Sequence, residues 1–176
     1  MDLLEGPALA SSLPIKWKIV EDPVDTGTVL MSDDPVSEGG NSGVYLQNRF
    51  EIQILDGDRT QHGMAAVINE AASPYEAYNG TGKWNSYDIV FRAARFESGK
   101  LTEKPMVSLF FNGIKVHSNQ PISQVWGGEK SGNDGGKGLT DVPGGIKLQC
   151  EGHDVRFRNG WIKEIDLKTA VTDFAK

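Results

Sequence analysis

Hydrophobic and polar residues alternate with a period of two along several short segments of the chain. In the segment FEIQIL, Phe50, Ile52 and Ile54 lie on one side. Glu51 and Gln53 lie on the other side. Because side chains of a β-strand point alternately to the two faces of a sheet, this pattern predicts a strand with one buried face. The second face is predicted to contact water or a ligand.

The same alternation predicts short strands along most of the chain. The 21 glycines fall between these segments and indicate turns. A chain of 176 residues is the size of one ordinary domain. We therefore predict one all-β domain over residues 1–176, a sandwich or jelly roll. The predicted strands are 15–20, 43–47, 50–55, 86–91, 106–111, 114–117, 145–150, 155–158 and 161–167.

Two dipeptides are predicted to turn hairpins. Asn112-Gly113 separates VSLFF from IKVHS, and Asn-Gly is a strong hairpin signal because a type I′ turn needs two positive φ angles. Asn48-Arg49, between VYLQ and FEIQI, is predicted to turn a second hairpin.

Three further segments break the strand pattern. Residues 65–72 are predicted to form a short helix or an irregular crossover that stops before Pro74. The first 37 residues are expected to be irregular, and the glycine-rich segment 126–145 is expected to be a loop at the rim of a site.

Charge and composition exclude several classes of partner. The formal net charge is −6 and no Lys/Arg cluster is visible, which argues against a nucleic-acid phosphate backbone. No apolar run approaches the roughly 20 residues that a membrane-spanning helix needs, and no signal peptide is recognisable. The single cysteine, Cys150, excludes an internal disulfide.

Acids and amides recur on two separate predicted strands. In GIKLQCEG the apolar residues share one parity, which leaves Lys147, Gln149 and Glu151 on the other. These side chains would meet Glu51 and Gln53 if both strands belong to one concave sheet. Carboxylates and amides bind sugar hydroxyls, and a carboxylate can act as general acid or base. The alternative is a solvated face with cross-strand polar pairs.

Aromatic and histidine residues give weaker evidence for a sugar-binding or metal site. Four aromatic residues lie near turns or on strand ends, where aromatic rings either stack on a sugar or cap a core: Tyr45, Trp84, Tyr87 and Trp126. His62, His117 and His153 are too scattered to form a recognisable metal motif. The sequence therefore requires no cofactor, although it leaves a divalent metal open.

Four motifs resemble the 3-keto-disaccharide hydrolase domain family over about residues 38–167. They are GGNSGVYLQNRFEIQILD, GKWNSYDIVFRAARF, VSLFFNGIKVHSN and GGIKLQCEGHDVRFRNGWIKEI, in this order. The resemblance implies a concanavalin A-like jelly-roll sandwich of two antiparallel sheets. It also implies action on glycosides whose sugar is oxidised to a ketone at C3.

The resemblance implies roles for the individual residues that match the family motifs. Glu51 and Gln53 match the family's E-x-Q, and Gln149 and Glu151 match its "LQSEG". We expect Glu51 or Glu151 to act as acid/base and the two glutamines to hold sugar hydroxyls. The candidate substrate-binding residues are Arg49, Gln53, Gln149, His153, Arg156, Arg158 and, among the aromatic residues, Trp126.

Three functions of different classes are compatible with these residues. The first is an enzyme that cleaves 3-keto-disaccharides or related glycosides; the second is a non-catalytic carbohydrate-binding module with the same fold. The first two bind an oxidised di- or oligosaccharide or a related sugar. The third is a structural or adaptor domain whose polar face contacts another protein. Members of the family are often exported, so the resemblance implies a periplasmic or extracellular location in a bacterium.

Overall fold

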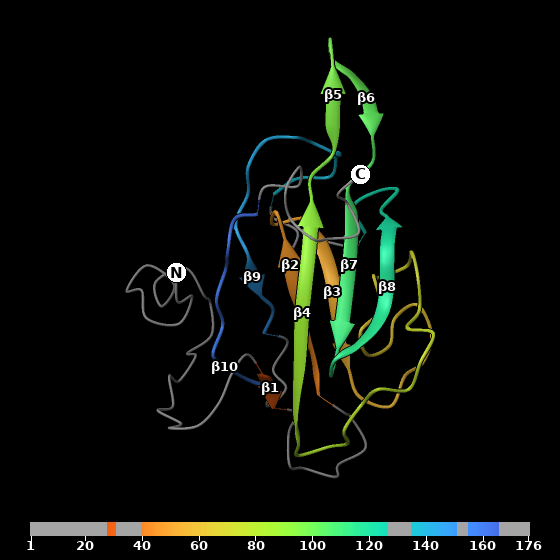
Figure 1. The fold of residues 1–176 in the computed structure, drawn as a ribbon, viewed down its shortest axis with the longest axis vertical. Coiled ribbons are helices and arrows are strands. Elements are labelled where there is room, and N and C mark those ends of the chain that lie inside the picture. Colours follow the sequence, from red (N-terminus) through yellow and green to blue (C-terminus); the bar gives the residue numbers. More distant parts are fainter. Residues whose placement is uncertain (1–27, 31–39, 127–134, 151–154, 166–176) are drawn as a thin grey trace.

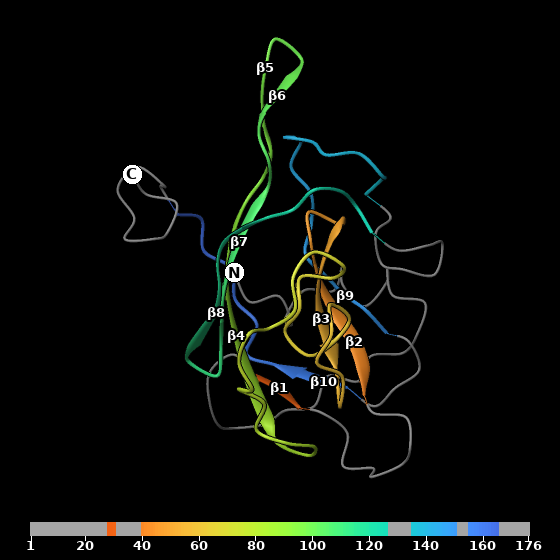
Figure 2. The same cartoon turned by 90° about the vertical axis from the view of Figure 1, so that its right-hand side faces the viewer.

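The fold consists of two stacked antiparallel β-sheets and one projecting hairpin (Figures 1 and 2). The computed structural model describes residues 28–30, 40–126, 135–150 and 155–165, and these residues contain no helix. One sheet has the order β10 (Arg156–Arg158), β1 (Thr28–Leu30), β4 (Trp84–Arg92), β7 (Met106–Phe111) and β8 (Ile114–Pro121). The other has the order β3 (Phe50–Leu55), β2 (Asn41–Leu46) and β9 (Lys147–Leu148). The hairpin consists of β5 (Arg95–Glu97) and β6 (Lys100–Glu103).

The hydrophobic core lies between the two sheets. Figure 2 shows β4, β7 and β8 in one layer and β2, β3 and β9 in the other. Ile52 and Ile54 of β3 belong to the same buried cluster as Val107 and Leu109 of β7. The all-β sandwich of two antiparallel sheets is therefore confirmed, and the apolar parity of β3 faces its interior.

Most predicted strands in the described residues are present. β3 and β7 have the predicted bounds, and β4, β8 and β10 differ at their ends. The segment predicted as strand 145–150 pairs only at Lys147 and Leu148. Strand 15–20 lies outside the described residues.

Two predictions about secondary structure were wrong, and one hairpin was not predicted. Residues 161–165 form no strand beyond a single bridge residue, because Trp161 and Ile162 are exposed and contribute nothing to the buried core cluster. Within the segment expected to be irregular, Thr28–Leu30 forms β1 between β4 and β10. The hairpin of β5 and β6 was missed, although Ser98-Gly99, with φ angles of 50° and 76°, supplies its turn.

The two predicted hairpin turns have different outcomes. Asn112 and Gly113 join β7 to β8 with φ angles of 50° and 78°, as predicted. The turn between β2 and β3 is centred on Gln47-Asn48 instead of Asn48-Arg49, with φ angles of 57° and 53°. Gln47 Nε2 and Asn48 N donate hydrogen bonds to carbonyl groups of the later segment 140–145, and such distant contacts are invisible in local sequence.

The crossover after β3 is irregular rather than helical. Its backbone runs beside β3, because Gln53 N donates to Ala66 O at 2.9 Å and Ala65 N donates to Gln53 O at 3.0 Å. The backbone groups of 65–68 that bond β3 are unavailable for a helix. The second of the two predicted alternatives is therefore observed.

Replacing Asn112 by Ala should destabilise the domain by about 3 kcal/mol. The Asn112 side chain donates to Ala77 O at 2.5 Å and to Asn85 Oδ1 at 2.7 Å, and it accepts from Ser86 N at 2.7 Å. Loss of each partly buried bond costs about 1 kcal/mol, and alanine tolerates positive φ poorly. Urea unfolding measures the difference. Asn112→Gly should cost less because glycine accepts the backbone angle, and equal costs for the two variants would contradict the φ argument.

The domain should lose stability as the pH falls below about 6.5. His117 is buried on β8, with Nε2 at 2.8 Å from Ala65 O. Burial lowers the pKa of His117 below its ordinary value of 6.5, so the unfolded chain takes up a proton there that the folded protein does not. One such proton changes the free energy of unfolding by at most about 1.4 kcal/mol per pH unit.

Urea titrations at pH 7 and pH 5 measure this slope. His117→Gln removes the titrating group, and its stability should vary less between the two pH values than that of the wild type. Equal slopes in the two proteins would show that His117 does not contribute.

Candidate functional site

The candidate site is the outer face of the three-stranded sheet. β3 and β9 both pair with β2, which places the two acid and amide motifs in one sheet. Tyr45 of β2 lies opposite Glu51 of β3 and Lys147 of β9. Because Phe50, Ile52 and Ile54 pack into the core, their neighbours point away from it. Glu51, Gln53 and Gln149 therefore share one face.

Tyr45 joins the acid of one strand to the amide of the other. Its hydroxyl donates to Glu51 Oε2 at 2.7 Å, and Gln149 Nε2 donates to the same hydroxyl at 3.4 Å. Tyr45 has no exposed surface, yet it is absent from the hydrophobic core cluster. The sequence pointed to Tyr45 only as an aromatic residue near a turn, and its hydrogen bond to Glu51 follows from the strand register.

Gly43 makes room for the Glu51 carboxylate. It lies beside Glu51 and Gln53 on the same face, and a Cβ built on Gly43 would collide with Glu51 Oε1. The nearest Glu51 carbon, Cγ, would lie at 2.9 Å from that Cβ. Gly43 therefore leaves the space that the Glu51 carboxylate occupies.

The predicted open face is instead largely buried. Glu51, Gln53 and Gln149 expose 8%, 6% and 8% of their surfaces. The alternation of polar and apolar residues was interpreted as a strand with one wet face, and this was wrong. The period of two reports which side chains face the core, but not whether other parts of the chain cover the outer face.

Besides Gln149, three further candidate binding residues have protein partners. Gln53 Oε1 accepts from the backbone N of Ile54 at 3.1 Å. Arg49 Nη1 donates to Gly138 O at 2.9 Å, which ties the β2–β3 turn to the glycine-rich segment. Trp126 Nε1 donates to Glu70 Oε1 at 2.9 Å.

The structure does not bring Arg156 and Arg158 to Glu51. Both lie on β10 in the five-stranded sheet, and Phe157 between them packs against the core. The two arginines therefore point out of the opposite side of the sandwich. Arg158 stacks on Trp84, with its guanidinium carbon 3.8 Å from the ring centroid.

Glu151 and His153 lie outside the described residues. The predicted pairing of the two acids across a cleft therefore stays a prediction. Within the described ranges, no group of three or more His, Cys, Asp or Glu side chains could hold a metal ion.

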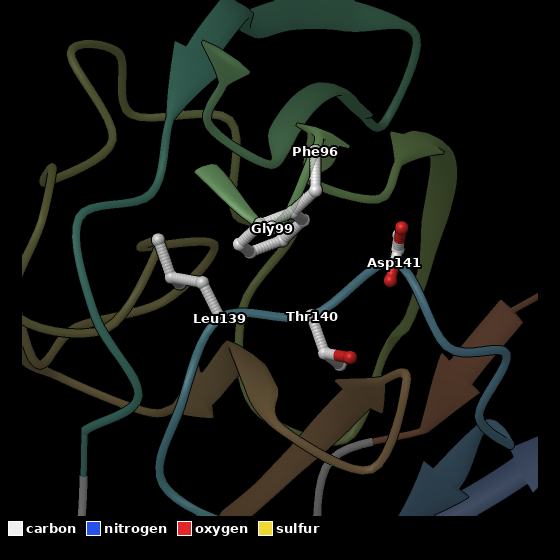
Figure 3. A pocket seen from close by; sticks show the side chains of 5 residues that line it. All are labelled: Phe96, Gly99, Leu139, Thr140 and Asp141. Atoms are coloured by element: carbon white, nitrogen blue, oxygen red, sulfur yellow. The ribbon is translucent and has the colours of Figure 1, made fainter. Parts of the chain in front are cut away.

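A separate open hollow lies between the β5–β6 hairpin and the segment 139–141 (Figure 3). Its volume is about 370 Å³. The Phe96 ring and the Leu139 side chain lie on one side, and the Asp141 carboxylate lies on the other. None of the residues predicted from the sequence to bind substrate lines it.

Comparison with known families gives a match over most of the chain. The model of the family described as "3-keto-alpha-glucoside-1,2-lyase-like domain" matches residues 15–163. This match begins earlier than Gly39, where the first of the four sequence motifs begins. Comparison with curated protein sequences found no match.

A solved structure has a similar fold. It is the crystal structure of a candidate glycosyl hydrolase from Parabacteroides distasonis, with a TM-score of 0.65 and 25% sequence identity. The similarity covers 80% of the present chain but only 65% of that protein. In the described part of the present chain, no helix is long and apolar enough to cross a membrane.

Proposed function

Because the chain belongs to the family of 3-keto-alpha-glucoside-1,2-lyase-like domains, we propose that it cleaves the glycosidic bond of 3-keto-glycosides. The observation that carries this proposal is the hydrogen bond between Tyr45 and Glu51 on the outer face of the sheet. Removing a carboxylate from water costs several kcal/mol, and core packing does not require one on this face. A buried carboxylate oriented by a hydroxyl is typical of a site for proton transfer.

The proposed reaction begins with proton abstraction. The C3 ketone acidifies the hydrogen on C2, and the Glu51 carboxylate removes it as general base. The electron pair left on C2 forms the C1–C2 double bond as the C1–O bond breaks. Water then adds across this double bond, which completes hydrolysis. The leaving oxygen needs a proton, and Glu151 is the second acid that the sequence offers for this step.

Neighbouring residues hold the base in place. Tyr45 fixes one oxygen of Glu51, and Gln149 fixes Tyr45 in turn. Gln53 keeps an amide N–H₂ group for a sugar hydroxyl, since its Oε1 is bound to the backbone. Lys147 lies across from Tyr45 in the strand register. In this proposal its ammonium charge stabilises the enolate oxygen.

Incubation with matched substrates tests the proposal. We expect cleavage of 3-keto-glucosides and no cleavage of the unoxidised glucosides, because only the ketone acidifies C2. In D₂O the product should carry deuterium at C2, above the level of an enzyme-free control. Cleavage without deuterium uptake would contradict elimination. Parallel reactions with a chelator test whether a divalent metal takes part.

A non-catalytic sugar-binding role is the competing function. Calorimetric binding of a 3-keto-disaccharide without any turnover would favour it and overturn the enzymatic proposal. The periplasmic or extracellular location implied by the resemblance is part of the same proposal, and fractionation of the native cells tests it.

A further inference from the structure

We propose that Glu70 is a positioning residue that holds the indole ring of Trp126 against the sugar bound beside Glu51. This inference rests on the proposed function and assigns a residue that the sequence motifs did not indicate. Glu70 Oε1 accepts three hydrogen bonds from the segment that follows β8: from Trp126 Nε1 at 2.9 Å, from Ser123 N at 2.8 Å and from Gln124 N at 3.3 Å. One carboxylate oxygen therefore fixes both the backbone of this segment and the ring at its end.

The turn that carries Glu70 is anchored beside β3. Val67 and Ile52 form an antiparallel bridge, and both are buried in the core. Glu70 N donates to Val67 O at 2.9 Å, which closes the turn. In addition, Gln61 Nε2 donates to Glu70 O at 3.4 Å. The backbone of Glu70 is therefore fixed to the core independently of the bonds that its side chain makes.

The same turn brings Glu70 close to the candidate base. Ile68 N donates to Glu51 O at 3.2 Å, so these two residues lie opposite each other, with Cα atoms about 5 Å apart. Glu70 follows Ile68 by two residues, which adds at most about 7 Å. The Cα atoms of Glu51 and Glu70 therefore lie within about 12 Å of each other. Figure 2 shows the segment that follows β8 crossing from the layer of β4, β7 and β8 toward the outer side of the layer of β2 and β3, where the Glu51 side chain lies.

Trp126 is not used by the hydrophobic core. Ile122 and Val125 of the same segment belong to the buried core cluster. Within the part of the chain that the structure describes, Trp126 is half-buried and lies outside that cluster. The negative face of an aromatic ring attracts the C–H groups of a pyranose. The bond at Nε1 lies in the plane of the indole, so it orients the ring without covering either face. A sugar beside Glu51 therefore gives this ring a role that core packing does not.

Kinetics of paired variants test the role of Glu70. Trp126→Ala should raise KM for methyl 3-keto-glucoside about tenfold with little change in kcat, because stacking stabilises the bound ground state and the transition state alike. Glu70→Ala should raise KM to a similar extent, and the double variant should be no worse than Trp126→Ala alone. Glu70→Gln keeps an oxygen that accepts the three bonds and should restore most of the loss. Glu76→Ala removes an exposed glutamate elsewhere and should match the wild type.

Two kinetic outcomes would contradict the inference. An unchanged KM in Trp126→Ala or in Glu70→Ala would overturn it and leave the proposed function intact. Additive effects of the two changes would also overturn it, because Glu70 would then act by a route other than Trp126. Thermal unfolding of each variant shows that the compared proteins are folded.

The indole N–H resonance of Trp126 separates this inference from the proposed function. In ¹⁵N-labelled protein the resonance is identified by its absence in Trp126→Phe, and without sugar it should move in Glu70→Ala. If the wild type cleaves no 3-keto-glycoside, the proposed function fails, and titration of methyl 3-keto-glucoside tests the inference alone. A shift of this resonance with sugar that weakens in Glu70→Ala would support the inference. A resonance that does not respond to the sugar would overturn it.

Discussion

Glu51→Gln is expected to lower kcat for 3-keto-glucosides by about 10²- to 10⁴-fold, the usual contribution of a general base. The amide cannot accept the C2 proton. It has nearly the same shape as the carboxylate, and its oxygen still accepts the hydrogen bond from the Tyr45 hydroxyl at the position of Oε2. The protein should therefore fold normally, and steady-state kinetics together with thermal unfolding measure the two effects separately.

A matched control is available on the β5–β6 hairpin. Glu97 is an exposed glutamate, and Glu97→Gln makes the same chemical change outside the candidate site. Its kcat should equal that of the wild type. Unchanged turnover in Glu51→Gln, with the wild type active, would show that Glu51 is not the base and that the site must be assigned elsewhere.

Ile52→Asp is expected to leave the chain largely unfolded at 25 °C. Ile52 has no exposed surface and packs in the core between the sheets. An unpaired carboxylate at this position costs about 3–5 kcal/mol, and the lost apolar contacts add to this. Since a domain of this size is stable by only about 5–15 kcal/mol, little stability would remain.

The conservative change at the same position provides the control. Ile52→Val keeps the residue apolar and should cost about 0.5–1.5 kcal/mol. Circular dichroism and urea unfolding compare the three proteins. A native spectrum for Ile52→Asp would mean that the β3 side chains face the opposite way, with Glu51 toward the core.

Local sequence was sufficient to predict those strands and turns that depend on neighbouring residues along the chain. The alternation in FEIQIL placed β3 at residues 50–55, and Asn112-Gly113 supplied two residues that tolerate positive φ. Local sequence was insufficient for a turn whose conformation depends on hydrogen bonds to a distant segment. The turn at Gln47-Asn48 is held by residues 140–145, and no local signal records those contacts.

The candidate site also has residues that the sequence placed correctly and residues that it did not. Strand parity placed Glu51, Gln53 and Gln149 on the side away from the core, and the sheet order brings them together through β2. The family motifs also suggested Arg156 and Arg158. Because Phe157 between them packs against the core, both arginines point outward on the other side of the sandwich. Gln149 and Arg156 belong to the same family motif, yet they lie beside β9 and on β10, which belong to different sheets.

The sequence by itself determined the all-β class and the direction in which each β3 side chain points, because backbone geometry alternates side chains whatever surrounds the strand. Only the tertiary structure decided that Tyr45 bonds Glu51, that the polar face is buried, and that a hollow forms beside Phe96. These features depend on strand register and on contacts between residues far apart in the chain, and no local pattern encodes such contacts.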